Sequence, residues 1–524
     1  MNYLTPLDYT VIALYILALA GLGIWVSRKK EAQQDLFLAG RSLGWKTIGL
    51  SIFGTNISPM AMISNCGLAF AYGMVASNFE WLAWVFILLL AMFFLPYYAG
   101  LRITTMPEFI RHRFGERSRN VLSWIIFIQI SIGAGSVLFA GSLLVSQITG
   151  WPITGCIVLV ALLAVSFTVM GGLKAVALTD SFQSLLMIGA CGILTVVGFR
   201  EVGGWGALWS QVPASHWHLF RPASDASYPW YAIVLGYPVM GVWYWCANQT
   251  IVQNALGGKN LREGQRGVLF ASYLKVLIPV IFLLPGILCA ALHPDLKHPD
   301  EAFMTMVVNY LPHGLIGLVI SALVAALIST ITSMFNSGST VFTLDIYKKH
   351  VNPDLSPEQS VRVGRWSMGG LCALAMLIAF GQSAIVGLSL FEIVNSIFSF
   401  LAPSLTVVFL TGVFWKRATG QAAFYTLALG NIPSLLIGLG YLSHYPSRAF
   451  YPHFLLISFF LFIALLLFMI VVSLLTAPAP EEAGFPTLPQ AYQRAGYTPS
   501  ESKDVWLGWA LLALVMISLY VYFN

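Results

Sequence analysis

Charged residues are scarce in this sequence. Of 524 residues only 9% are Asp, Glu, Lys or Arg, whereas 58% are hydrophobic, and the mean hydropathy is +0.79. A soluble domain of this length cannot bury so much apolar side-chain surface. The composition therefore excludes a water-soluble protein and predicts a polytopic membrane protein.

Cysteine and histidine are also few, and neither forms a chemical pattern. The six cysteines all lie in hydrophobic segments without metal-ligand spacing, which is typical of small packing residues rather than of a disulfide framework. His112, His313 and His350 lie apart at predicted loop edges, so they do not form the clustered site of an integral-membrane enzyme. The stretch Met1–Asp8 lacks the basic segment of a signal peptide, and no soluble output domain is recognisable. We therefore expect neither an enzyme nor a cleaved leader.

Long apolar runs are the main feature that is present. Fourteen of them are long enough to cross a bilayer as helices, which takes about 20 apolar residues. They lie at 8–27, 48–72, 80–101, 121–148, 152–173, 175–200, 230–254, 268–293, 314–345, 363–385, 388–414, 420–443, 453–476 and 505–523. The sequence therefore predicts an all-α membrane protein with 14 transmembrane helices.

Lysine and arginine are unevenly distributed between the loops. Arg200, Arg221, Lys297 and Arg448 are the only ones in the loops on one side, whereas 22 lie in the loops on the other side. Short basic loops stay in the cytoplasm. We therefore expect both termini to lie outside, in a multi-pass protein of the plasma (inner) membrane.

Two runs, five spans apart, contain helix-breaking residues. The second is interrupted within 51–60 and the seventh within 236–241, each by glycine and proline. A lone proline kink is common in membrane helices, but a matched pair of breaks is typical of inverted five-helix repeats whose binding sites lie at the unwound points. We therefore expect one transporter domain over 1–524. Its parts are a leading helix at 8–27 and two five-helix repeats at 48–200 and 230–414. Three trailing helices follow at 420–523, with a cytoplasmic linker at 477–503.

An aspartate lies inside the sixth run. The stretch 171–183 turns on Gly171-Gly172 and then places Asp180 about 9 Å further along a helix than Lys174. An unpaired carboxylate at that depth in lipid costs at least about 2.5–3.5 kcal/mol. Asp180 therefore either pairs with Lys174 at the interface or binds a cation inside the bundle, and we favour the cation.

The ninth run carries polar side chains on one face. At 100° per residue its hydroxyl and amide groups fall within about ±60° of one line, and they belong to Ser329, Thr332, Ser333, Asn336 and Thr340. Single hydroxyls often bond back to their own helix. As a set, however, they offer the oxygen ligands that hard cations such as Na+ require.

Two motifs carry a resemblance to a known family. Residues 171–183 contain every fixed position of the pattern Gly-Gly-x-x-Ala-Val-x-x-Thr-Asp-x-x-Gln, and 329–347 contains Ser-Thr-Ile-Thr-Ser followed by Thr-Leu-Asp-Ile-Tyr. Through them, residues 8–475 resemble the sodium:solute symporter family, which implies a LeuT-like inverted 5+5 helix bundle with flanking helices. The resemblance implies a sodium site formed by Gly54, Ile57, Ala326, Ser329 and Thr330. A second sodium site, present in only some members, would comprise Asp180, Ser329, Thr332 and Ser333.

The solute side resembles the sodium–glucose cotransporter branch. The matching segments are 79–81, 243–253, 273–275 and 391–395, although Ala247 and Asn248 depart from the pattern of the branch. The resemblance implies an inner gate at Tyr244 and outer gates at Phe79 and Phe391. It also implies that the solute-binding residues are Asn56, Glu80, Tyr244, Trp245, Lys275 and Asn395.

The chemistry of these residues supports such a site independently. Lys275 lies about 12 Å from the basic end of its helix, too deep to snorkel easily to lipid phosphate. Glu80 lies at an outer helix end, where an exposed interfacial carboxylate is the alternative. Ammonium, carboxylate, amide and aromatic groups together suit a neutral polyhydroxylated ligand. Ala61 and Asn395 replace larger polar residues of the branch, so the sequence does not imply glucose itself.

We therefore predict a sodium-coupled secondary active symporter that imports a sugar or sugar-like polyol by alternating access. Its partners are Na+, the solute and membrane lipid, and no nucleic acid is expected. The alternatives are a sodium symporter for another organic solute, such as sialic acid, inositol or an amino acid, and a transporter-like sensor. The sequence leaves the solute and the oligomeric state open.

Overall fold

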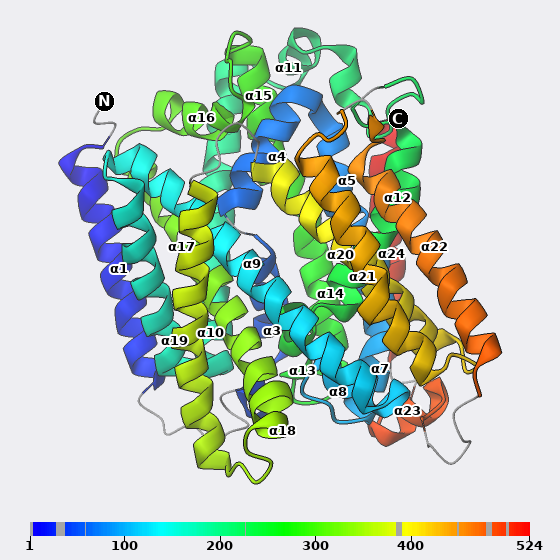
Figure 1. The fold of residues 1–524 in the computed structure, drawn as a ribbon. Coiled ribbons are helices and arrows are strands. Elements are labelled where there is room, and N and C mark those ends of the chain that lie inside the picture. Colours follow the sequence, from blue (N-terminus) through cyan, green and yellow to red (C-terminus); the bar gives the residue numbers. More distant parts are fainter. Residues whose placement is uncertain are drawn as a thin grey trace.

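The computed structural model describes residues 4–27, 37–57, 59–225, 227–383, 390–447, 450–477, 485–498 and 502–524. These ranges form helices and connecting turns, with two isolated backbone bridges and no β-strand among them. The helices pack side by side as one bundle (Figure 1). The predicted all-α architecture is therefore confirmed.

Several helices follow one another directly, through π-helical segments at 90–94, 243–247, 279–283 and 342–347. The α-helices are α1 (Pro6–Ser27), α3 (Trp45–Asn56), α4 (Pro59–Tyr72), α5 (Asn78–Trp81), α6 (Ala83–Leu89), α7 (Leu95–Gly100), α8 (Met106–Phe114), α9 (Glu116–Thr149), α10 (Ile153–Val202), α11 (Trp205–Gln211), α12 (Trp230–Val242), α13 (Gln249–Leu256), α14 (Leu261–Ile278), α15 (Leu284–Leu292), α16 (Ala302–Tyr310), α17 (Leu315–Val341), α18 (Lys348–His350), α19 (Pro357–Ser383), α20 (Leu390–Phe414), α21 (Gly420–Leu442), α22 (Phe454–Leu475), α23 (Leu488–Arg494) and α24 (Lys503–Tyr522).

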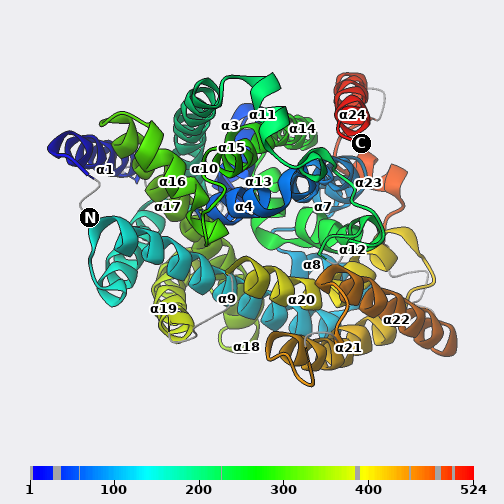
Figure 2. The same ribbon diagram turned by 90° about the horizontal axis from the view of Figure 1, so that it is seen from above.

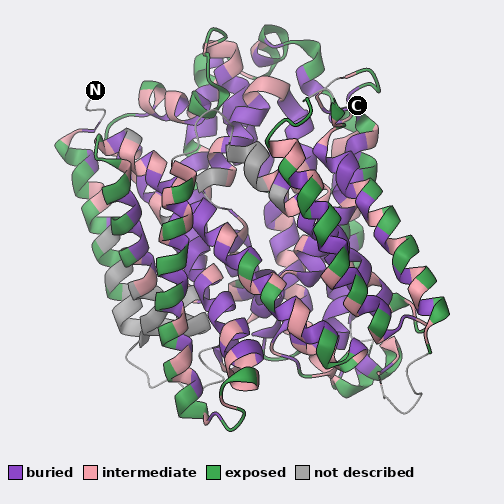
Figure 3. Cartoon of the chain, viewed as in Figure 1, coloured by how far each residue is buried: buried purple, intermediate pink, exposed green. Residues whose placement is uncertain are grey.

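The outer surface of the bundle is apolar. In the described part of the chain, nine helical stretches are long and apolar enough to cross a membrane. Leu17, Leu436 and Leu507 on the peripheral helices α1, α21 and α24 are each more than half exposed, whereas the interior of the bundle is buried (Figure 3). Helices that are apolar both inside and outside the bundle are typical of membrane proteins.

The centre of the bundle is built around α3 and α4. Seen from above, α4 and α13 lie near the middle, and α1 and α22 lie at opposite edges (Figure 2). Helix α3 packs against α10, α14 and α17, and α10 packs in turn along α17. Polar residues of the predicted second, sixth and ninth runs therefore meet inside the protein.

The break predicted in the second run is confirmed. Helix α3 ends at Asn56, Ile57 has an extended backbone (φ −99°, ψ 100°), and α4 begins at Pro59. Proline is tolerated at the first position of a helix because its missing N–H has no helical partner there. The Ile57 N–H closes the last turn of α3 on the Phe53 carbonyl at 3.2 Å, and regular helical geometry is interrupted at this residue.

The break predicted in the seventh run lies at the wrong place. Helix α12 continues through Pro238, passes into the π-helical segment, and leaves helical geometry only at Asn248 (ψ 122°). The glycines have another role, because a Cβ on Gly236 would lie 2.2 Å from the Leu455 carbonyl oxygen, and one on Gly241 would lie 2.4 Å from the Phe86 ring. They permit close helix packing rather than unwinding.

The predicted loop between the fifth and sixth runs, at the glycine pair 171–172, is also wrong. Helix α10 continues through it and is 50 residues long. A straight helix would separate Ala161 from Asp180 by about 28 Å. Yet Ala161 shares a hydrophobic cluster with Ile331 of α17, and Asp180 hydrogen bonds Ser329 of the same helix. The two parts of α10 on either side of the glycine pair therefore both lie against α17, so α10 is not one straight helix.

Candidate functional site

A cavity of about 200 Å³ lies between the two helix breaks. Asn56 at the end of α3 donates a hydrogen bond to the Tyr244 hydroxyl of the π-helical segment, at 2.9 Å, so the two breaks meet across it. The structure brings all six predicted solute-binding residues to its wall, and these are Asn56, Glu80, Tyr244, Trp245, Lys275 and Asn395. They come from five helical segments that are far apart in the sequence.

A buried ion pair forms the polar wall of this cavity. Lys275 is only 4% exposed, and its ammonium donates to Glu80 Oε2 and to Asn56 Oδ1, each at 2.5 Å. The second carboxylate oxygen of Glu80 accepts from Asn65 Nδ2 at 3.0 Å. A buried charge requires such pairing. The pair is neutral as a unit but still offers donor and acceptor groups.

Aromatic rings form the rest of the cavity wall. Trp243, Tyr244 and Trp245 are consecutive residues, yet all three line the cavity, because the π-helical segment changes the angle between successive side chains. The Lys275 ammonium lies 4.8 Å from the centre of the Trp245 ring, within the range of a cation–π contact. The cavity thus combines flat apolar surfaces with a compact polar network.

One of the two predicted outer gates can be followed in the structure. Phe79 lines the cavity, packs edge to face on Tyr237 and Tyr228, and its carbonyl oxygen accepts a hydrogen bond from the Tyr237 hydroxyl at 2.8 Å. The side chain of Phe391, the other predicted gate, lies outside the described residues. The aromatic cluster around Phe79 therefore covers one side of the cavity.

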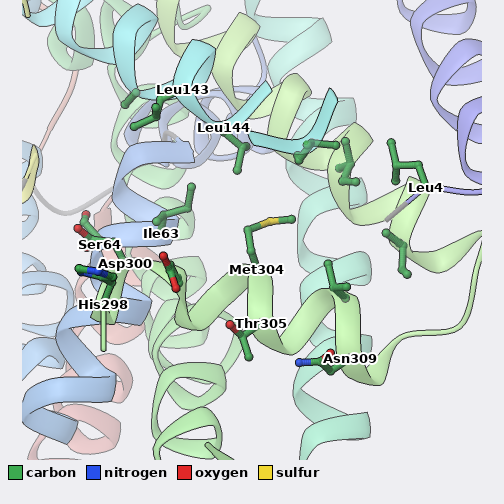
Figure 4. A pocket seen from close by; sticks show the side chains of 16 residues that line it. Leu4, Ile63, Ser64, Leu143, Leu144, His298, Asp300, Met304, Thr305 and Asn309 are labelled. Atoms are coloured by element: carbon green, nitrogen blue, oxygen red, sulfur yellow. The ribbon is translucent and has the colours of Figure 1, made fainter. Parts of the chain in front are cut away.

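A larger hollow of about 610 Å³ lies beside the cavity, between α4, α9, α16 and α17. Figure 4 shows Ser64 beside His298 and Asp300 at one end, and Leu4 at the other. Ser64 also lines the central cavity, so the two spaces share one wall residue. The hollow belongs to the side of the protein that the loop charges predict to face outward.

The second polar centre surrounds Asp180. This residue is fully buried and accepts hydrogen bonds from Ser329 at 2.6 Å, Ser51 at 3.0 Å, and both Thr55 and Ser333 at 3.2 Å. No Lys, Arg or His pairs with it among the described side chains, and the side chain of Lys174 lies outside them. Three helices, α3, α10 and α17, therefore converge on one carboxylate through hydroxyl groups.

Comparison with known proteins identifies the family. The family model described as "Sodium:solute symporter family" matches residues 36–430. The chain belongs to this family. The symporter is 32% identical to sodium/glucose cotransporter 1 of Oryctolagus cuniculus, over 90% of this chain and 80% of that protein. It is 34% identical to sodium/myo-inositol cotransporter 2 of the same species, over 91% and 78%.

Solved structures support the same fold. A Na+-coupled sialic acid symporter, in a substrate-bound outward-open state, superimposes with a TM-score of 0.79 at 22% identity, over 91% of this chain and 99% of that one. Mhp1, a nucleobase-cation-symport-1 family transporter, superimposes with a TM-score of 0.56 at 14% identity, over 91% and 98%. The protein is thus a sodium-coupled solute symporter with a transporter fold, and its family is one of transporters rather than enzymes.

The five residues of the first predicted sodium site lie around the end of α3 and the middle of α17. Gly54 packs closely on α10, since a Cβ there would lie 2.7 Å from Ser184 Oγ. Ala326 and Ser329 are buried, and Ile57 lies at the break. The hydroxyl of Thr330 is buried at the edge of the central cavity and has no hydrogen-bond partner in the described part of the symporter. An oxygen in that position is able to accept a ligand.

The second predicted sodium site is assembled in part. Asp180, Ser329 and Ser333 meet directly, whereas the Thr332 hydroxyl donates to the Ser329 carbonyl at 2.9 Å and does not hydrogen bond Asp180. Sequence analysis missed Ser51 and Thr55, which reach the carboxylate from α3. Their spacing of four residues on a broken helix is a signal that could have identified them.

Other residues of the solute cavity were missed as well. Asn65 and Tyr237 contact Glu80 and Phe79, and Met240 and Trp243 line the wall. Tyr237 was missed because the stretch around it was expected to be unwound. A polar residue such as Asn65 inside an apolar run is itself a signal, since its amide needs a partner in the membrane.

Proposed function

We propose that this symporter couples inward movement of Na+ to uptake of a sugar or cyclic polyol by alternating access. The main support is the central cavity, in which the network of Lys275, Glu80 and Asn56 faces the aromatic rings of Trp243 and Trp245. A sugar or cyclitol ring presents hydroxyl groups around its edge and apolar C–H faces above and below. The polar network suits its edge, and the aromatic rings suit its faces.

The charges of the cavity favour a neutral solute. Lys275 and Glu80 are paired at 2.5 Å, and neither Asp nor Arg is among the described residues that line the cavity. A carboxylate of sialic acid, or the two charges of an amino acid, would need a free counter-charge to offset desolvation. A neutral polyol needs only hydrogen-bond partners. The relatives at 32–34% identity, which are named for glucose and myo-inositol, support the same class.

The two polar centres are connected through adjacent residues. Thr55 hydrogen bonds Asp180 and lies 3.1 Å from the Ser333 hydroxyl, and the next residue, Asn56, hydrogen bonds Lys275 and Tyr244. A cation that orders the end of α3 through Thr55 would also orient Asn56 toward the solute. This gives Na+ and solute a coupling free energy, which by linkage acts equally in both directions.

We assign the first sodium ion to Gly54, Ile57, Ala326, Ser329 and Thr330, through backbone carbonyls at the break and two hydroxyls. A second ion is assigned to Asp180, Ser329 and Ser333, with Thr332 or the α3 hydroxyls completing the oxygen set. A hydroxyl group can rotate from donating to a carboxylate to presenting a lone pair to a cation. The carboxylate with its four hydroxyls supports this assignment.

The topology that fits this mechanism has 14 spans, both termini outside and two inverted repeats, at 48–200 and 230–414, in the plasma (inner) membrane. The breaks at Ile57 and Asn248 support the repeats, since each interrupts the first helix of one repeat. The hollow beside Ser64 would be the outer approach to the solute cavity.

Uptake into proteoliposomes tests this function. Labelled glucose, galactose, myo-inositol, sialic acid and proline are offered under an inward sodium gradient, and under an inward proton gradient as the control. We expect accumulation of a sugar or cyclitol with sodium only. Sodium-driven uptake confined to sialic acid or proline would refute the solute class, and uptake indifferent to sodium would refute the coupling.

A further inference from the structure

A basic hollow lies at the side of the protein that is predicted to face the cytoplasm. Its volume is about 540 Å³, and four cationic side chains from separate segments line it, those of Arg41, Arg102, Lys259 and Arg494. No Asp or Glu is among the described residues of its wall. A concave surface lined by charges of one sign concentrates the electric field inside it.

One of these cations, Arg41, is held against the backbone of another, Arg102. Arg41 and Arg102 have φ angles of 50° and 51°, a left-handed conformation that is costly for residues other than glycine and tends to occur at functional sites. The Arg41 guanidinium donates to the carbonyls of Arg102 and Ile103 at 3.3 and 3.4 Å. Burial and the charge of Arg102 lower the pKa of Arg41, and the negative charge of Glu108 opposes this only in part. The Arg41 guanidinium is thus held on the backbone of Arg102, near enough for the charge of Arg102 to act on it.

The other three cations of the hollow have no partner among the residues that the structure describes. In the described part of the chain, the side chains of Arg102, Lys259 and Arg494 form no hydrogen bond or ion pair. Two other arginines of this side are paired within the protein, Arg119 with Asp345 and Arg266 with Asp504. The excess of basic residues in cytoplasmic loops explains their presence on this side, but it does not explain why unpaired ones converge on one hollow.

The hollow lies at the inner ends of α3, which lines the solute cavity, and of α13. Leu43, just before α3, exchanges backbone hydrogen bonds with Gly257 and Lys259, just after α13. Helix α23, which carries Arg494, is fixed on α7 because Gly100 leaves room for Ala491. The wall of the hollow therefore connects the inner ends of α3 and α13, which lead to the two helix breaks.

We propose that this basic hollow binds a phosphate-bearing anion, and that the bound anion holds the inner ends of α3 and α13 together. Guanidinium groups suit phosphate because their planar N–H groups pair with two oxygens at once. The phosphate could belong to a soluble phosphorylated compound or to an anionic lipid headgroup, which present the same chemistry. The binding step is independent of the proposed function; only its effect on transport depends on it.

Binding is tested on the full-length protein in phosphatidylcholine nanodiscs, titrated with inorganic pyrophosphate and followed by calorimetry. Arg102→Gln and Lys259→Gln should each weaken binding by about tenfold or more, since each removes a charge-assisted contact. Arg117→Gln and Lys416→Gln are matched controls, because both are exposed basic residues predicted on the same side but outside the hollow. Equal affinity in all four variants and the parent would refute the site. Equal weakening in all four variants would also refute it, because pyrophosphate would then respond to the overall positive charge of this side and not to the hollow.

A second arm separates the two sources of phosphate. Native mass spectrometry measures enrichment of phosphatidic acid over phosphatidylcholine around the parent and around Arg102→Gln. Enrichment that is lost in the variant and displaced by pyrophosphate assigns a lipid headgroup. Pyrophosphate binding without lipid enrichment assigns a soluble phosphate compound. The absence of both would overturn the proposal, and thermal unfolding of each variant without anion verifies that it is folded.

Discussion

Replacement of Lys275 by methionine separates a solute-binding role from a structural one. Methionine keeps most of the length of lysine but removes the ammonium that bonds Glu80 and Asn56. Glu80 is then left with Asn65 alone, as a buried carboxylate without a cation. Breaking a buried pair by removing one partner costs about 3–5 kcal/mol. We therefore expect Lys275→Met to lower the unfolding temperature clearly and to abolish solute binding.

The double variant Lys275→Met with Glu80→Gln removes both charges. Most of the stability should return, because replacing a whole buried pair by neutral groups is often close to neutral. Solute binding should not return, since each lost hydrogen-bond partner costs about 1–3 kcal/mol, or about 5- to 150-fold in affinity. In the double variant, stability should thus return while solute binding should not.

The assay measures equilibrium binding of the labelled solute at saturating Na+, together with thermal unfolding followed by tryptophan fluorescence. Lys297→Met is the matched control, because Lys297 is an exposed lysine of a loop that is predicted to lie outside. A double variant that regains both stability and binding would show that the pair only supports the fold. Normal binding in Lys275→Met would remove this residue from the solute site altogether.

Three further outcomes are expected. Ser329→Ala should raise the Na+ concentration for half-maximal uptake severalfold. Ser321→Ala, which removes a buried hydroxyl that donates to Gly317 of its own helix, should not, and equal effects would refute the ion site. Asp180→Asn should lower the coupling from two sodium ions per solute to one, measured from the reversal potential of solute-driven flux. The electrical driving force should then fall by about 2.3 kcal/mol at 100 mV. One ion per solute in both proteins would exclude the second site. Ala61→His with Asn395→Gln should improve uptake of glucose or galactose relative to the native solute, and an unchanged solute ranking would show that these positions do not contact it.

Sequence reasoning reached the solute cavity through motifs rather than through physics alone. Composition and depth singled out Lys275 as a buried cation, but its partners were assigned by resemblance to the sodium–glucose branch. That resemblance selected Asn56 and Glu80, and both bond Lys275 in the structure. Their roles toward solute and sodium stay predictions. Asn65 was not predicted as a residue of the cavity because it belongs to none of these motifs.

The breaks show where local patterns fail. Pro59 marked a real interruption because it begins a helix after the extended Ile57. Pro238 marked none, since α12 accommodates it and the chain leaves helical geometry ten residues later. Glycines near Pro238 looked the same in sequence as those near Pro59. Glycine does not distinguish the two stretches, because Gly54 before the real break also permits close helix packing, on Ser184, as Gly236 does on Leu455.

The sequence by itself determined the features that depend on composition and short-range pattern. Apolar runs of spanning length dictate a helical membrane protein, since lipid offers backbone groups no other partners, and the motif around Asp180 dictates the family. Tertiary structure alone decided which polar groups meet. Ser51 and Thr55 reach Asp180, and Arg41 lies beside Arg102, only because helices distant in sequence pack in one register. The residues that flank a hydroxyl or a guanidinium in the sequence do not indicate which distant residue will contact it once the helices pack.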